Sequence, residues 1–300
     1  MVNQTSDRAI SAAQNTVWTP TDGGATSAAR SANTAEGQSL YKAATASTKD
    51  TSQKHVTNLQ IGSEHVKGAD GNDMQIWRDK SGNVTQSLEH TKDGGKMIKS
   101  YKYDPETNNM TSAVWTETDK NNKLTYGTAQ HFDGKTGNMT SDYHQFADGT
   151  YHGRKFDADS NLVSSTDGDA NGNKTVHQFN NKGQETDRYN TSQSTGINDH
   201  QHFVSGHLSY KVQSDALNHS STTTTYDPNT HHALTYDKQY GNGSSTHMQM
   251  DPNTDIVVSQ TSMDKSGNGT STTRDSQTGK VTHVNPIRQG HIVNPGLQSY

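Results

Sequence analysis

Residues 167–173 read DGDANGN, and their types and spacing are those of oxygen ligands for calcium. Asp167, Asp169 and Asn171 stand two residues apart and precede a glycine, as in the first half of a helix–loop–helix calcium loop. Such a loop carries a bidentate glutamate at its twelfth position, which here is Gln178. Two interpretations stay open: a polar turn, or a weak calcium site formed by Asp167, Asp169 and Asn171. No other cofactor is expected.

The 16 histidines are the next candidates for chemistry. His200 and His202 alternate on one face of a predicted strand, and His231 and His232 fall in a predicted turn. A zinc site needs three or four converging ligands, and the sequence has neither a cysteine nor a His-Glu-x-x-His spacing. We therefore interpret these histidines as surface or strand residues.

Enzyme motifs are absent from the sequence. There is no Gly-x-Ser-x-Gly elbow, no P-loop and no dinucleotide fingerprint. With 31 acidic residues, carboxylate pairs arise by chance and do not indicate a glycosidase. The prediction is a non-enzymatic protein, and a hydrolase that uses surface carboxylates is the alternative.

Composition limits the elements that could position these residues. Only 26% of the 300 residues are hydrophobic, too few for a thick core, while a net charge of −5 is too small for a charge-expanded disordered chain. A narrow sheet needs few apolar residues if its backbone groups are paired, so it fits both the low hydrophobic content and the small net charge. The absence of cysteine excludes disulfides, no apolar run is long enough for a membrane span, and the dispersed basic residues do not indicate nucleic acid binding.

A period of about 24 residues begins near residue 75 and predicts a repeat protein. In most copies an aspartate anchors a turn, often followed by proline, and a glycine or asparagine comes three or four residues later. In two copies Asn180 and Val204 take the place of the aspartate. The aspartate anchors are Asp79, Asp104, Asp133, Asp157, Asp227, Asp251 and Asp275.

A second turn follows each anchor by 12–15 residues in most copies, and DGDANGN occupies this place in the fourth copy. Two turns per repeat leave two strands of about seven or eight residues. The predicted fold is therefore all-β: an elongated antiparallel β-hairpin repeat. A β-solenoid, with one repeat per coil, is the alternative.

The residue before the anchor is usually aromatic or large. Equivalent residues one repeat apart are expected to form a row across the sheet, contributing mainly to stability, with a ligand-stacking platform as the alternative. The aromatic members of this row are Tyr103, Phe132, Phe156, Phe179, Phe203 and Tyr226.

Residues 132–157, FDGKTGNMTSDYHQFADGTYHGRKFD, and the turn DANGN at 169–173 resemble the YD (Rhs-type) repeat of bacterial polymorphic toxins and their relatives. The resemblance covers about residues 75–285. It implies β-hairpins joined into a long curling sheet, and an association with secreted or cell-surface proteins and with carbohydrate contact. The chain is much shorter than the toxin shells of that family, so we expect hairpin repeats without encapsulation.

Three regions are expected along the chain. Residues 1–55 are rich in Ala, Ser and Thr and predict a disordered tail, residues 56–285 the hairpin repeat domain, and residues 286–300 a C-terminal tail. The first 20 residues lack a continuous apolar stretch, so no Sec-type signal peptide is expected.

The expected function is that of an exported structural or interaction protein that binds glycans or a protein partner at the cell surface. The alternative is a secretion-system effector or a toxin-associated YD-repeat component. The predicted location is extracellular, reached without a Sec signal, with the cytoplasm as the alternative. An open sheet also has edge strands that can pair with a second copy, so edge-to-edge self-association is expected.

Overall fold

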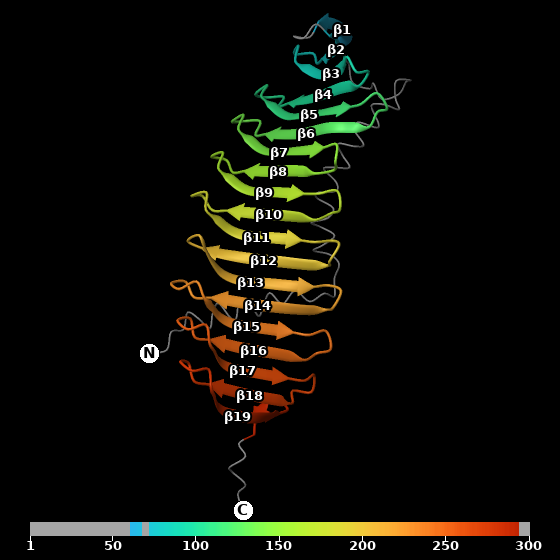
Figure 1. Ribbon diagram of the computed structural model, residues 1–300. Coiled ribbons are helices and arrows are strands. Elements are labelled where there is room, and N and C mark those ends of the chain that lie inside the picture. Colours follow the sequence, from blue (N-terminus) through green and yellow to red (C-terminus); the bar gives the residue numbers. More distant parts are fainter. Residues whose placement is uncertain (1–60, 68–71, 294–300) are drawn as a thin grey trace, which may run out of the picture. The chain divides into compact units, whose positions relative to one another are not determined.

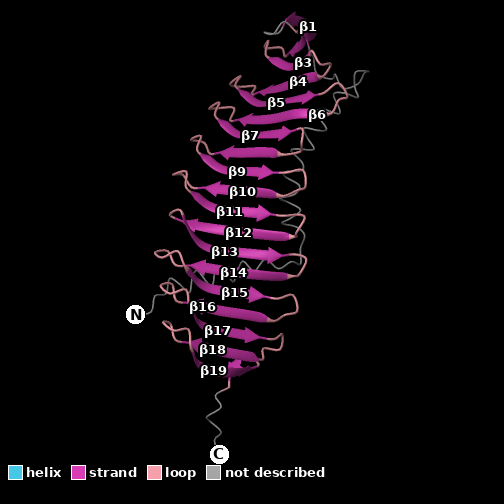
Figure 2. Cartoon of the chain, in the orientation of Figure 1, coloured by secondary structure: helices cyan, strands magenta, loops and turns pink. Residues whose placement is uncertain are grey.

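The structure is a computed structural model that describes residues 61–67 and 72–293. The predicted tail over residues 1–55 lies outside the described residues. Twenty strands and their turns make up the described part of the chain, which contains no helix (Figures 1 and 2). The fold is thus all-β, as the sequence predicts.

The strand bounds follow the 24-residue period, with two strands to each repeat. The first ten strands are β1 (Ile61–Lys67), β2 (Asp73–Arg78), β3 (Val84–His90), β4 (Lys96–Tyr103), β5 (Met110–Thr118), β6 (Leu124–Phe132), β7 (Met139–Phe146), β8 (Tyr151–Phe156), β9 (Leu162–Gly168) and β10 (Lys174–Phe179). The other ten are β11 (Glu185–Thr191), β12 (Ile197–Val204), β13 (His207–Asp215), β14 (Ser220–Tyr226), β15 (Ala233–Gln239), β16 (Ser245–Met250), β17 (Val257–Met263), β18 (Gly269–Arg274), β19 (Val281–Arg288) and β20 (His291–Ile292).

Each strand pairs antiparallel with the strand that follows it in sequence, so all 20 belong to one open sheet (Figure 1). A β-solenoid would instead pair equivalent strands of successive coils in parallel. The hairpin repeat is therefore confirmed, and the solenoid alternative is wrong. Tight turns with suitable residues at positive φ favour the antiparallel arrangement.

The anchor aspartates hold the first turn of each repeat through their carboxylates. In the turn after β6, Asp133 Oδ1 accepts hydrogen bonds from the backbone N–H of Lys135 at 3.0 Å and of Thr136 at 2.7 Å. Every one of the seven anchors accepts the N–H two residues ahead of it. Asn180 replaces the aspartate with its amide oxygen, which accepts from Lys182 N at 2.9 Å.

A β-bulge lies directly before each of these turns. The register of β6 and β7 shifts between His131 and Phe132, so that Phe132 lies opposite Met139 across the hairpin. The same shift precedes Tyr103, Phe156, Phe179 and Tyr226. All six residues of the aromatic row therefore lie at bulges, on the even-numbered strands from β4 to β14, with an odd-numbered strand between successive members.

The sixth repeat departs from the pattern. Val204, the expected anchor, belongs to β12, and the turn is the two-residue Ser205–Gly206, whose φ angles are +53° and +84°. Positive φ at both positions is the geometry of a type I′ hairpin, whose twist matches that of the flanking strands. The second turn of this repeat is held by Asp215, whose carboxylate accepts Leu217 N at 2.9 Å.

The sheet continues beyond residue 285, where the repeat domain was expected to end. Pro286 lies within β19 opposite Thr270, and its carbonyl accepts Val293 N at 2.8 Å. The nitrogen and oxygen of a residue point to the same side of an antiparallel strand, so the missing N–H of Pro286 costs no bond to β18. Ile287 and Arg288 then pair with β20.

Candidate functional site

One continuous ladder of residues runs across the middle of the sheet on a single face, which we call the first face. It takes one residue from every strand, because each register pair shares its side of the sheet. From β7 to β13 the ladder is His144, His152, Asp167, Thr175, Asn190, Asp199 and Gln213. Seven consecutive strands thus present polar side chains in one row.

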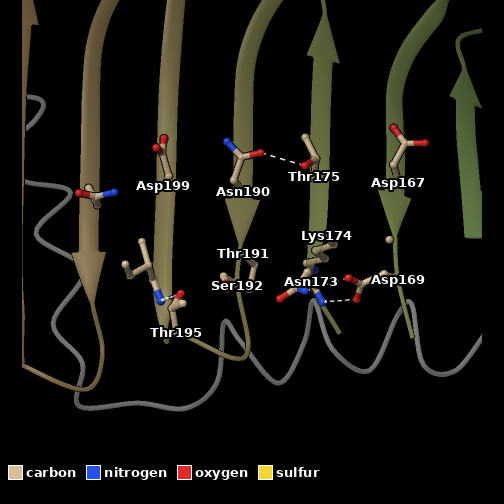
Figure 3. A pocket seen from close by; sticks show the side chains of 13 residues that line it. Asp167, Asp169, Asn173, Lys174, Thr175, Asn190, Thr191, Ser192, Thr195 and Asp199 are labelled. Atoms are coloured by element: carbon tan, nitrogen blue, oxygen red, sulfur yellow. Dashed lines mark hydrogen bonds between the residues drawn. The ribbon is translucent and has the colours of Figure 1, made fainter. Parts of the chain in front are cut away.

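A hollow of about 470 Å³ lies over the ladder from β9 to β13. Figure 3 shows Asp167, Thr175, Asn190 and Asp199 side by side on neighbouring strands at its base. The turns after β9 and β11 supply its rim, including Asp169, Asn173, Ser192 and Thr195. Most of its lining residues carry carboxylate, amide or hydroxyl groups, and the others are Gly168, Lys174 and Ile197.

Several of the lining groups hold one another in place. Thr175 Oγ1 donates to Asn190 Oδ1 at 2.9 Å, and Lys211 Nζ lies 2.8 Å from Asp199 Oδ2. The amide nitrogen of Asn190 and the amide of Gln213 have no partner among the described residues. The hollow therefore combines positioned acceptors with amide groups that are available to a ligand.

The three residues of the predicted calcium site are placed differently from one another. Asp167 and Asp169 line the hollow, whereas Asn171 is exposed in the turn. Asp167 is hydrogen-bonded to His152. Asp169 accepts from Asn173 Nδ2 at 2.8 Å and from Asn171 N at 2.9 Å, in the same way as the anchor aspartates.

These turn contacts favour the ionised form of the Asp169 carboxyl group. The side-chain amide of Asn173 and the backbone N–H groups of the turn hold the pKa of Asp169 below its ordinary value. In the described part of the chain, no group of three or more His, Asp, Glu or Cys side chains has the arrangement of a metal site.

An aromatic platform adjoins the hollow on the first face; it consists of Trp115, Tyr126 and Phe146. The ring centroids of Tyr126 and Phe146 are 5.7 Å apart, and those of Trp115 and Tyr126 are 6.2 Å apart. Phe146 is 37% exposed. His144 accepts or donates at 2.6 Å to the Tyr126 hydroxyl and fixes that ring.

The opposite face carries a second cluster around Asp187 on β11. His200 Nε2 and His202 Nδ1 lie 2.9 and 3.0 Å from Asp187 Oδ1, so the two predicted histidines meet one carboxylate. Tyr189 stacks on His200 at 4.3 Å, and Tyr210 stacks on His202 at 5.0 Å. Burial acts to raise the pKa of Asp187, but the hydrogen bonds from both histidines outweigh it and hold that pKa below its ordinary value.

The residues of the aromatic row take part in neither cluster. Tyr103 donates its hydroxyl to the carbonyl of Val84 at 3.1 Å, Phe179 stacks on His177 at 6.3 Å, and Phe203 lies under the guanidinium of Arg188 at 5.3 Å. Among the described residues, no ring–ring contact joins two members of the row.

Sequence reasoning missed the ladder itself. Thr175, Asn190, Asp199 and Gln213 come from four strands and are 9 to 15 residues apart, and their alignment depends on the register of three successive strand pairs. The available signal was the alternation of polar residues within each predicted strand, but a bulge before every first turn shifts that alternation by one residue.

No family model matches the sequence, and no curated protein matches it. The TcdB2-TccC3-Cdc42 crystal structure aligns with 76% of this chain and 17% of its own, at 12% identity and a TM-score of 0.20. The Tc holotoxin pore of Photorhabdus luminescens aligns with 72% of this chain and 15% of its own, at 14% identity and a TM-score of 0.15.

The periplasmic gluconolactonase PpgL of Pseudomonas aeruginosa aligns with 78% of this chain and 87% of its own, at 10% identity and a TM-score of 0.17. This chain therefore spans less than a fifth of the toxin chains that it resembles. Scores this low assign the chain to no family, so the evidence for its function lies in its own surface. The described residues include no helix long and apolar enough to cross a membrane.

Proposed function

We propose that this chain is a non-enzymatic interaction protein that binds carbohydrate on the first face of its sheet. The observation that carries the proposal is the hollow over β9–β13, with its row of carboxylate, amide and hydroxyl groups. Sugar hydroxyl groups donate and accept hydrogen bonds at once, and such a row offers partners of both kinds. The amide nitrogen of Asn190 and the whole side-chain amide of Gln213 have no partner among the described residues.

A rigid scaffold supports this proposal. The side chains of the hollow stand on paired strands, so their spacing is set by the sheet. The Thr175–Asn190 and Lys211–Asp199 contacts hold three of them, Thr175, Asn190 and Asp199, in place before any ligand arrives. Preorganisation of this kind reduces the ordering cost of binding.

A glycan array probed with the full chain tests the proposal. The wild-type protein is expected to retain a defined set of neutral glycans, and the Asn190→Ala/Gln213→Ala double variant is expected to lose most of that signal. Gln249→Ala is the matched control, because Gln249 is an exposed strand amide on the opposite face, far along the sheet in β16. An array without signal above background, or equal signal from the double variant, would remove carbohydrate binding at the hollow.

We further propose that the protein works outside the cell. The absence of cysteine and a mean hydropathy of −1.06 support a chain that crosses a membrane unfolded and stays dissolved afterwards. Fractionation of the producing cells, with a cytosolic marker enzyme as control, tests this placement. Retention of the protein with the cytosolic marker would contradict it.

A further inference from the structure

The hollow and the aromatic platform form one continuous surface through His152. The ring of His152 packs edge-on against Phe146 at 5.7 Å, and its Nδ1 is hydrogen-bonded to Asp167 at the edge of the hollow. His152 lies on β8, between the platform strands β5–β7 and the hollow strands β9–β13, and its side chain is 58% exposed. A ligand that leaves the hollow over Asp167 therefore meets His152 and then Phe146.

The spacing of this surface is that of the strands. Neighbouring strands are about 4.7–4.9 Å apart, so the seven steps from β6 to β13 cover about 34 Å. One pyranose ring adds a similar length to an extended β-1,4-linked chain. A glycan that lies across the strands would therefore meet a new strand with about every ring, in register with the ladder.

The surface offers an aromatic ring at one end and amide groups at the other, and both can contact sugar rings. Phe146 presents an exposed ring on which the C–H face of a sugar can stack. Asn190 and Gln213 present amides to hydroxyl groups at the other end. The hollow is lined by three aspartates, Asp167, Asp169 and Asp199, and by Lys174, and Lys211 pairs with Asp199. The negative charges outnumber the positive ones by one, which disfavours an anionic glycan.

We propose that the ligand is a linear, uncharged, β-1,4-linked glycan that lies across the strands, with one end in the hollow and the rest over the aromatic platform. This inference rests on the proposed function and adds the class, direction and length of the ligand. It predicts that affinity grows with chain length until the oligomer covers both parts of the surface.

Calorimetric titration of the full chain with oligomers of two, four and six rings tests the inference. The probes are the β-1,4-linked glucose and N-acetylglucosamine series, and oligogalacturonate is the anionic comparison. The six-ring oligomer of at least one neutral series is expected to bind about tenfold or more tightly than its disaccharide. Oligogalacturonate is expected to bind more weakly than the neutral oligomer of equal length.

Three variants locate the contacts. Phe146→Ala is expected to lower the affinity for the six-ring oligomer by about tenfold and to leave disaccharide binding within about twofold of wild type. Asn190→Ala/Gln213→Ala is expected to weaken binding of every length, and Gln249→Ala of none. Thermal melts check that each variant is folded, because the Phe146 ring also packs against Tyr126 and His152.

The outcomes separate the inference from the proposed function. Equal affinity at all lengths, or an equal effect of Phe146→Ala on short and long oligomers, would confine the ligand to the hollow; the inference then fails while carbohydrate binding stands. Tighter binding of oligogalacturonate would also overturn it. Absence of binding by every oligomer, together with a blank glycan array, would remove both.

Discussion

The anchor aspartates act through hydrogen bonds to the backbone, and the chain itself shows which atom matters. Asp133 and Asn180 each begin the first turn of a repeat, and in each an Oδ1 atom accepts the N–H two residues ahead, at 3.0 and 2.9 Å, although the turn at Asp133 is one residue longer. Both side chains provide an acceptor oxygen, but only that of Asp133 carries a negative charge. Turn geometry therefore depends on the oxygen.

Replacing Asp133 by alanine or asparagine separates these contributions. Asp133→Ala removes the acceptor for Lys135 N and Thr136 N and is expected to lower the melting temperature by a few degrees at pH 7. Asp133→Asn is expected to retain most of the stability, as Asn180 does. Circular dichroism melts measure both, and equal melting of wild type and Asp133→Ala would contradict the assigned role.

The same turns also need one residue with positive φ. Gly137 (φ +75°) and Ser160 (φ +65°) are the positive-φ residues of two first turns, four residues after Asp133 and three after Asp157, and a Cβ at residue 137 would meet open space. Backbone strain therefore decides the effect of a side chain at residue 137. Gly137→Ala is expected to destabilise the fold by about 1–2 kcal/mol, and Ser160→Gly to stabilise it slightly. Urea unfolding measures both, and a stabilising Gly137→Ala would contradict the expectation.

At the scale of elements, the hairpin turns together predict acid sensitivity. Backbone N–H groups of Thr107, Thr136 and Thr230 hold the pKa values of the aspartates that they contact, Asp104, Asp133 and Asp227, below the ordinary value of 3.8. A carboxyl group whose pKa is lower in the folded state stabilises the fold at pH values above its unfolded pKa. That stabilisation is lost as the pH falls through the folded-state pKa.

The free energy of unfolding is therefore expected to stay nearly constant above about pH 5 and to fall progressively below about pH 4. Urea titrations between pH 2.5 and 7 in buffers of equal ionic strength measure this dependence. A variant with asparagine at residues 104, 133 and 227 should lose less stability in acid than the wild type. An identical acid profile for the two proteins would contradict the role of the turn carboxylates.

The hairpin β7–β8 contains a buried charge that depends on its partner. The Asp142 side chain is 3% exposed, and Arg154 binds both of its oxygens at 3.1 and 2.5 Å. Arg154→Met removes the guanidinium from the buried carboxylate and leaves His144 Nε2, 3.7 Å away, as its neighbour. The change is expected to cost about 2–3 kcal/mol, near the lower limit because Arg154 is half exposed. Asp142→Asn added to Arg154→Met should recover part of the loss in urea unfolding, and a double variant less stable than Arg154→Met would refute this account.

The regular hairpins were predictable because each repeat encodes its turns locally. An aspartate with a glycine or asparagine behind it specifies a turn in which one residue has positive φ, and alternation specifies the strands beside it. A turn was expected at Val204, but the structure places Val204 in β12 and forms a two-residue turn at Ser205–Gly206, because valine has no side-chain acceptor for the N–H groups of a longer turn. Residues 286–300 were expected to form a tail, yet Pro286 lies in β19, which tolerates proline because the missing N–H does not face β18.

The candidate site was only partly predictable for a different reason. Asp167 and Asp169 were recognised as ligand-bearing residues, but their neighbours across the sheet were not. Cross-strand neighbours depend on register, and every bulge at a residue such as Phe132 or Phe156 changes it by one. The Asp187 cluster needs two further strands in register, so the His200–His202 alternation alone could not identify its carboxylate partner.

At the scale of the whole sheet, the last long strand is only partly covered. β20 pairs with β19 at Ile287 and Arg288, and no strand of the described residues covers the remainder of β19. Val281 and Val284 on β19 are 50% and 58% exposed. An uncovered edge with apolar side chains favours strand pairing with a second copy.

Light scattering over a concentration series is expected to show association of the wild-type chain. Val284→Lys should reduce it, because a charged side chain at an edge disfavours pairing. Thr270→Lys on the covered strand β18 is the comparison for added charge alone. A wild-type chain that stays monomeric at every concentration would contradict the expectation.

The strict sequence order of the strands has a consequence for folding and for changes in length. Each strand makes its main contacts with the two strands next to it in sequence, so no distant segments must meet before the sheet can form. Stability then approximates a sum of hairpin terms and nearest-neighbour interfaces, as in a one-dimensional Ising chain. Such a molecule frays from its ends, and it can gain or lose whole hairpins by duplication or deletion while the remaining interfaces stay unchanged.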